Sequence, residues 1–390
     1  MKQFFLFVFL LATSWVPVAA QVTAGTPGSR HKLAVFTPLY LDNAFGPDGS
    51  YNYDNKSFPK VSIPGLEFYH GVSMAIDSLN AQQIPLDVYI YDSKSSRQSI
   101  ESQFNKAAAD GVELIIANCS LNDLGILAKL AASKKITVMN ATVPNDGNVR
   151  NNPYFVVVNP TLPTQGEQIY AYLKKNYPGQ QITYLTRKGT SENYLRSVFE
   201  TLNKADRSTA MHIKFVEVRD TLSQAQVASN FVKGKSSLFV IGSLDNNYAD
   251  QLLTQLVRLN RIYPSITVMG MPTWDNLNFS KYKGLSLIYS NPFYNSRSDV
   301  ASRNISTYYS AKMFARPSDL VFRGFGLVYR FGHLLNQYNG NMPGLLESNQ
   351  FKVFYDLDIK PVSKENNIDY YENKKLYFLK YFNGNLEEIK

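Results

Sequence analysis

Residues 112–142 read VELIIANCSLNDLGILAKLAASKKITVMNAT, with a short apolar run on either side of a segment of helical periodicity. In the middle segment Leu124, Leu127, Leu130 and Ala131 recur at helical spacing, and two lysines follow in the last turn. This crossover is too long for a hairpin turn. We therefore predict two buried parallel strands joined by a helix.

Polar side chains follow both predicted strands, where ligands bind on open parallel sheets. Each of them can donate and accept a hydrogen bond. They are Asn118, Ser120, Asn122, Asn140 and Thr142. The serine and the threonine could instead cap helices, and the asparagines could shape turns. No nucleophile with a base and no metal cluster accompanies them, so we predict one wall of a site for a small polar molecule.

Composition indicates an ordinary globular protein. The chain has 390 residues, which favours two domains, and 44% of its residues are hydrophobic while 18% are charged. The formal net charge is +9, but lysine and arginine are scattered and cluster only in pairs. We interpret this charge as solubility or attraction to anionic surfaces, and we expect no nucleic-acid partner.

The first 20 residues have the pattern of a signal peptide. Lys2 precedes the apolar run Phe4–Ala12, and Val18-Ala19-Ala20 is a small-residue cleavage site. We expect cleavage after Ala20, a flexible leader over residues 21–30, and no transmembrane segment in the mature chain. Because Cys119 is the only cysteine, no intrachain disulfide can form, and the combination suits a bacterial periplasm.

From residue 31 onward, strand and helix patterns alternate in two runs that are separated by a break at residues 159–164. Such alternation is typical of parallel sheets covered by helices on both faces. It predicts two similar α/β lobes. Residues 38–64 are expected to form a long loop, and the alternating segments FKVFYDL and KKLYFLKYF near the end are expected to be strands with one exposed face.

The order of these segments resembles the type I periplasmic solute-binding proteins, the branch that includes Leu/Ile/Val-binding proteins of ABC importers. The resemblance covers about residues 31–338. It lies in HKLAVFTPLY, GLEFYHGVSMAIDSLN, the VELIIANCS–ITVMNAT pair, MGMPTWDN followed by NPFY, and RPSDLVFRGFGLVYRFGHLL.

The resemblance implies two Rossmann-like lobes with parallel central sheets joined by three hinge crossings. The N-terminal lobe would comprise residues 31–157 plus 293–345, and the C-terminal lobe residues 158–288 plus 349–390. The hinge segments would lie near residues 158–161, 287–292 and 344–350.

The resemblance also implies ligand contacts. Ser120 and Thr142 occupy positions that hold a ligand carboxylate in amino-acid-binding members, and Tyr40 and Asp42 follow the first strand. Asp245 is the first candidate partner for a ligand ammonium group and Asp275 the second. The other implied contacts of the second lobe are Lys188, Ser191, Ser243 and Trp274. Trp274 could instead pack under the hinge, and Lys188 could be solvated.

Enzymatic function is not expected, because Gly-x-Ser-x-Gly, P-loop and His-Glu-x-x-His motifs are missing and the four histidines lack metal-ligand spacing. No metal or cofactor is expected either. We predict a monomeric, periplasmic solute-binding protein that closes on an amino acid or related compound and serves an ABC permease. The alternative is a ligand sensor or cell-envelope protein of the same fold that binds cell-wall fragments.

Overall fold

The computed structural model describes residues 30–53, 58–206, 211–364 and 366–389. The predicted signal peptide, residues 1–20, and residues 21–29 of the predicted leader lie outside the described residues. Arg30, the last residue of that leader, is held in place, because its guanidinium donates to Asp87 Oδ1 at 2.5 Å and to the carbonyl oxygen of Leu86 at 2.6 Å.

The first of two seven-stranded sheets in the described residues has the order β11-β12-β5-β4-β3-β1-β2. Every neighbouring pair is parallel except β11 with β12, which is antiparallel. Its strands are β1 (His31–Thr37), β2 (Leu86–Asp92), β3 (Leu114–Ala117), β4 (Thr137–Asn140), β5 (Phe155–Val157), β11 (Ile359–Lys364) and β12 (Asn367–Asn373).

The second sheet has the order β14-β13-β10-β9-β8-β6-β7 and is parallel from β7 to β10. The last hairpin, β13 with β14, joins it antiparallel to β10. Its strands are β6 (Ile182–Thr186), β7 (Ile213–Glu217), β8 (Ser237–Ile241), β9 (Ile266–Met269), β10 (Ser286–Asn291), β13 (Tyr377–Phe382) and β14 (Asn385–Ile389). The orders β2-β1-β3-β4-β5 and β7-β6-β8-β9-β10 are equivalent, so the prediction of two similar, mostly parallel α/β lobes is confirmed.

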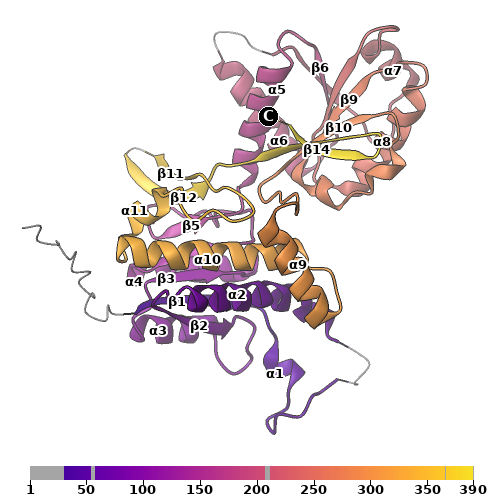
Figure 1. Cartoon of the computed structure of the whole chain (residues 1–390). Helices are drawn as coiled ribbons and strands as arrows, with labels where there is room; N and C mark the ends of the chain where they lie inside the picture. The colour runs from indigo at the N-terminus through magenta and orange to yellow at the C-terminus, as the bar shows by residue number, and fades with distance from the viewer. Residues whose placement is uncertain (1–29, 54–57, 207–210, 365, 390) are drawn as a thin grey trace, which may run out of the picture.

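Helices cover both sheets, and Figure 1 shows the two lobes as separate bodies that meet at a few chain connections. The helices of the first lobe are α1 (Leu41–Ala44), α2 (Ile63–Ala81), α3 (Ile100–Ala109), α4 (Leu121–Lys134), α9 (Val300–Met313), α10 (Asp319–Tyr338) and α11 (Met342–Glu347). Those of the second lobe are α5 (Leu162–Asn176), α6 (Thr190–Ala205), α7 (Gln224–Asn230) and α8 (Asn246–Leu259). Three 3-10 turns complete the set, namely η1 (Lys60–Ser62), η2 (Pro272–Asn276) and η3 (Phe279–Lys281).

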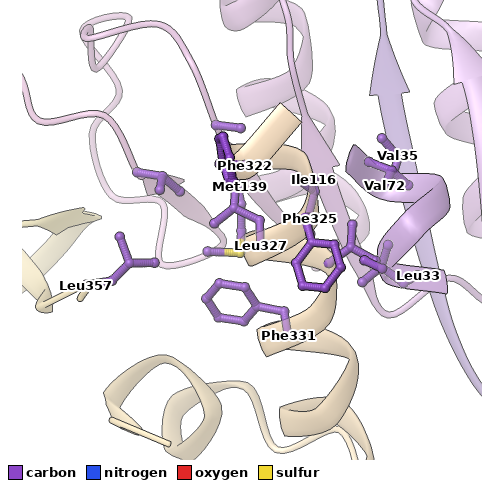
Figure 2. Packing of buried hydrophobic residues seen from close by; sticks show 14 of the residues in the cluster. Leu33, Val35, Val72, Ile116, Met139, Phe322, Phe325, Leu327, Phe331 and Leu357 are labelled. Carbon is purple, nitrogen blue, oxygen red and sulfur yellow. The ribbon is translucent and has the colours of Figure 1, made fainter. Parts of the chain in front are cut away.

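The first lobe has a core on each face of its sheet, one against α3 and α4 and the larger one against the pair α2 and α10. Figure 2 shows Phe325 and Phe331 of α10 in the same cluster as Leu33 of β1 and Val72 of α2. Burial of such side chains contributes about 1.5–3 kcal/mol each relative to exposure. Two glycines, Gly71 of α2 and Gly324 of α10, let these two helices approach closely. A Cβ at Gly71 would lie 2.0 Å from the carbonyl oxygen of Val321, which is closer than the atoms of a folded protein can come.

The last part of the chain is divided between the lobes, so the prediction that residues 349–390 belong to the C-terminal lobe is wrong for residues 351–373, which pack into the core of the first lobe or extend its sheet. Strand β12 pairs with β5 and extends the first sheet, whereas only β13 and β14 join the second sheet. The segment FKVFYDL is not a strand, because Phe351 and Phe354 adopt positive φ angles of 53° and 67°. Extended backbone requires negative φ.

Three connections join the two sheets. They follow β5 at residues 158–161, β10 from residue 292, and β12 at residues 374–376. The third hinge was predicted at residues 344–350, and this is wrong: α11 packs Leu345 and Leu346 into the core of the first lobe.

A buried polar network ties the first and third connections together. Glu372, at 1% exposure, accepts hydrogen bonds from the backbone N–H and the hydroxyl of Thr161, at 2.7 and 2.8 Å. Lys374 Nζ donates to Glu372 at 2.5 Å and to the Thr164 hydroxyl at 2.7 Å. Because Thr161 is the N-cap of α5, the carboxylate at the end of a first-lobe strand stabilises the start of a second-lobe helix.

Candidate ligand-binding site

The predicted polar residues after β3 and β4 lie at one end of the first sheet, and two of them, Asn118 and Thr142, are hydrogen-bonded to each other. Asn118 Nδ2 donates to the Thr37 hydroxyl at 3.2 Å, and the Thr142 hydroxyl donates to Asn118 Oδ1 at 3.1 Å. Asn140 is fully buried, and its side chain binds the backbone of Val143 and Asn145. These contacts shape the loop after β4, which is the turn-forming role that was weighed for the asparagines.

Ser120 combines a helix-capping role with a neighbouring charge. Its backbone N–H and its hydroxyl both donate to Asp123 Oδ2, at 3.1 and 2.6 Å, at the start of α4. Lys94 Nζ lies 3.1 Å from the Ser120 hydroxyl and 2.6 Å from Asp123. The pKa of Asp123 is lowered by the hydrogen bonds from Lys94 and Ser120, although burial, the largest single influence, raises it.

The predicted second-lobe residues Ser243 and, through Arg187, Asp245 are linked to the buried carboxylate of Glu192. Glu192 accepts from the Ser243 hydroxyl at 2.6 Å and lies 3.3 Å from Arg187 Nε. Arg187 also donates to Asp245 Oδ2 at 2.8 Å, and this hydrogen bond is the main reason why the pKa of Asp245 is lowered. Asp245, the first candidate for binding an ammonium group, is thus already paired with a cation.

The remaining predicted residues do not converge on one place. Asp42 accepts from the Ser95 hydroxyl and from backbone N–H groups at residues 96 and 97, so it anchors the loop after β2. Trp274 is fully buried in the core of the second lobe, where its ring fills the space beside Gly270, and it cannot stack on a ligand in this conformation. Tyr40 is half-buried at the N-cap of α1, and the other three side chains are exposed: Asn122, Lys188 and Ser191.

A cavity of about 480 Å³ lies between the lobes and is lined from both sides. Its walls include the first two connections, at Asn159 and Pro292, the turn η2, and the start of α10. Of the predicted ligand contacts, only Asp275, the second candidate partner for an ammonium group, lines it. Thr142 lies behind its wall, because Asn159 Nδ2 donates to the carbonyl oxygen of Thr142 at 2.7 Å. The amide side chains in the lining are Asn145, Asn159, Gln165, Asn276 and Asn291.

Arg323 of α10 is the cationic side chain in this lining, and its guanidinium makes few hydrogen bonds. Its Cζ lies 3.6 Å above the ring of Phe293, Nη1 reaches the carbonyl oxygen of Ala141 only at 3.5 Å, and the buried Nε has no hydrogen-bond partner among the described residues. Burial lowers the pKa of Arg323, while Tyr355 and the cavity carboxylates act in the opposite direction. An arginine nevertheless stays protonated at neutral pH, and its planar fork suits a carboxylate.

Two carboxylates line the same cavity. Asp275 of η2 belongs to the second lobe and accepts from the Tyr289 hydroxyl at 3.1 Å. The pKa of Asp275 is raised, first by burial in the cavity and then by Asp319, against the opposing effects of Tyr289, Asn291 and Arg323. Asp319 is already paired with Arg297 at 2.8 Å. The cavity therefore holds an arginine on one lobe and a carboxylate with a perturbed pKa on the other.

The periplasmic binding protein family matches residues 60–336, which is most of the chain. This chain belongs to the periplasmic binding protein family. No curated protein sequence gave a match. Because the family consists of solute-binding proteins without enzymatic activity, the prediction that the chain is not an enzyme is confirmed.

Solved structures of low sequence identity show the same fold over almost the whole chain. A putative branched-chain amino acid ABC transporter from Rhodospirillum rubrum is 13% identical with a TM-score of 0.65, and the match covers 92% of this chain and 99% of that one. A branched chain amino acid ABC transporter periplasmic ligand-binding protein from Burkholderia xenovorans LB400 is 13% identical with a TM-score of 0.61, covering 92% and 94%. An ABC transporter substrate-binding protein from Desulfitobacterium hafniense, solved with Leu, is 14% identical with a TM-score of 0.55, covering 92% and 99%.

Among the described residues, no helix has the length and apolar character needed to cross a membrane. Within the same residues, no group of three or more His, Cys, Asp or Glu side chains is placed to hold a metal ion.

Arg323 was not among the predicted ligand contacts, and Asp275 was only the second candidate partner for an ammonium group. Arg323 lies in RPSDLVFRGFGLVYRFGHLL, which served only as a mark of the fold. A signal was present, because an arginine inside an apolar helical face needs a partner or a cavity.

Proposed function

We propose that this periplasmic binding protein is exported and captures a small zwitterionic solute, an amino acid or a related compound, by closing its two lobes. The observation that supports this is the inter-lobe cavity, which is lined by an arginine of the first lobe, Arg323, and an aspartate of the second lobe, Asp275. Arg323 would bind the ligand carboxylate, and Asp275 would accept the ammonium group. The captured solute would then be delivered to an ABC permease in the membrane.

The two charges support a closure mechanism because they belong to different lobes. A ligand that carries both a carboxylate and an ammonium group gains both interactions only when the lobes approach, so it stabilises the closed conformation over the open one. A cavity of this size suits a single small molecule. Burial raises the pKa of Asp275, and perturbed pKa values of this kind cluster at functional sites; an ammonium group bound beside Asp275 would favour its ionised form.

Thermal-shift screening of the chain from Gln21 against amino acids, short peptides, sugars and cell-wall fragments tests the proposal. We expect at least one amino acid to raise the melting temperature, and calorimetry to give its dissociation constant. Arg323→Met and Asp275→Asn should each weaken binding by about tenfold or more, since hydrogen bonds to charged groups contribute about 1.5–3 kcal/mol. Arg258→Met, on the exposed side of α8, is the matched control and should leave binding unchanged.

A complete lack of response across the set, or undiminished amino-acid binding by Arg323→Met, would refute the proposed site. Binding of cell-wall fragments without amino acids would instead favour the sensor or cell-envelope alternative.

A further inference from the structure

One edge of the first lobe exposes large apolar side chains on two segments. After the loop that follows β1, Phe58, Val61 and Ile63 are 51%, 53% and 39% exposed. At the end of α9, Met313 and Phe314 are 41% and 94% exposed. We call these five side chains, together with the cations described below, the apolar–basic edge.

The two segments lie at the same place in the fold. The ring of Tyr309 on α9 lies 5.8 Å from that of His70 on α2, and the Ser318 hydroxyl donates to Glu67 of α2 at 2.7 Å. Phe314 falls between these two attachment points on one segment, and Ile63 is one turn before Glu67 on the other. Figure 1 shows the end of α9 and the loop before α2 on the same side of the lobe.

Phe314 combines an unusual backbone with near-complete exposure. It forms the C-cap of α9 with φ 52°, a left-handed conformation that bulky side chains rarely adopt. Its side chain is 94% exposed. A nearly fully exposed phenylalanine in a strained position is unusual for a surface that contacts only water.

Three cations accompany these apolar side chains. Lys60, Lys312 and Arg316 are exposed, and none of them takes part in the ion pairs or hydrogen bonds found among the described residues. Two carboxylates on the packed elements have other partners, Glu67 with Ser318 and Asp319 with Arg297. The edge is thus apolar at its tips and positively charged around them.

We propose that the apolar–basic edge docks this protein on the surface of a membrane that carries anionic phospholipids. Aromatic and aliphatic tips can enter the boundary between headgroups and acyl chains, while lysine and arginine remain at the level of the phosphates. Each cation near an anionic leaflet adds electrostatic attraction that salt weakens. A lipid surface fits better than a protein partner, because the apolar residues stand on a loop and a helix end. This docking would leave the inter-lobe cavity untouched.

Co-sedimentation with vesicles tests this proposal on the chain from Gln21, which lacks the apolar run Phe4–Ala12. We expect binding to phosphatidylglycerol–phosphatidylethanolamine vesicles at low salt, and much weaker binding to phosphatidylcholine vesicles. Phe314→Ser and Val61→Ser should each weaken binding by about tenfold, the loss expected for one inserted large apolar side chain. Val232→Ser, at a residue of the second lobe that is 57% exposed, should bind as the parent does.

The charge variant Lys312→Glu/Arg316→Glu should lose both the preference for anionic lipid and the dependence on salt. Circular dichroism checks that each variant is folded, and amino-acid binding checks the cavity separately. Absence of binding to anionic vesicles, or equal binding by Phe314→Ser and the parent, would overturn the proposal. Phe314-dependent binding to an acidic permease segment without vesicle binding would overturn it as well.

Discussion

Replacing Glu372 by alanine removes the buried carboxylate that joins the first and third connections. The substitution leaves the Thr161 N–H, the Thr161 hydroxyl and the Lys374 ammonium group without their acceptor. A buried donor left unpaired costs about 1–3 kcal/mol, and breaking a buried ion pair costs about 3–5 kcal/mol. Because Lys374 keeps partial contact with solvent and its bond to Thr164, we expect a total loss of about 3–5 kcal/mol.

Urea unfolding measures this loss. Trp274 is the only tryptophan after Trp15, which lies in the predicted signal peptide, so fluorescence of the chain from Gln21 reports the second lobe while circular dichroism reports both. Glu372→Gln keeps an oxygen for Thr161 and should lose only about 1–3 kcal/mol. The surface control Glu387→Ala should stay within about 0.5 kcal/mol of the parent. A Glu372→Ala variant as stable as Glu387→Ala would refute the stabilising role of the network.

Three further predictions concern individual positions. Because the pKa of Asp275 is raised in the folded protein, the stability it contributes is full below its ordinary value of 3.8 and is lost as pH rises through the folded value. Asp275→Asn should therefore melt at a higher temperature than the parent at pH 7 but not at pH 3.5, while losing the ligand response, and equal melting temperatures at pH 7 would contradict this. Gly71→Ala should destabilise the first lobe in urea titrations, because the added Cβ meets the backbone of α10. Gly125→Ala in α4 has open space around it and should raise the free energy of unfolding by about 0.5–1 kcal/mol. A Gly71→Ala variant as stable as the parent would argue against the close helix packing. Burial raises the pKa of the Cys119 thiol to about 12, so iodoacetamide should label it at pH 8 only after denaturation, and rapid labelling of the native protein would be inconsistent with the buried position.

The spacing of apolar residues along the sequence was sufficient to predict the alternation of strands and helices, because this spacing differs between helices and buried strands. The run before Asn118 and the helical spacing of Leu124 and Leu127 predict β3 and α4 correctly, and the alternation continues through both lobes. The same pattern could not assign β12 to a sheet. Alternating polarity specifies which face of a strand is exposed but not which neighbour it pairs with.

The site was less predictable for a related reason. Asn118 and Thr142 were correctly expected at neighbouring strand ends, and they are hydrogen-bonded to each other. Whether such side chains point at a ligand or at each other depends on loop geometry, which periodicity does not encode. Arg323 and Asp275 are separated by 48 positions and lie on different lobes, and only the chain connections bring them to one cavity.

Small-angle X-ray scattering of the chain from Gln21, with and without an amino acid identified by thermal shift, tests the proposed closure most directly. The radius of gyration should fall when the ligand is added to the parent protein, and it should not change for Arg323→Met at the same ligand concentration. A parent protein that is saturated with ligand but keeps its radius of gyration would contradict capture by closure of the lobes.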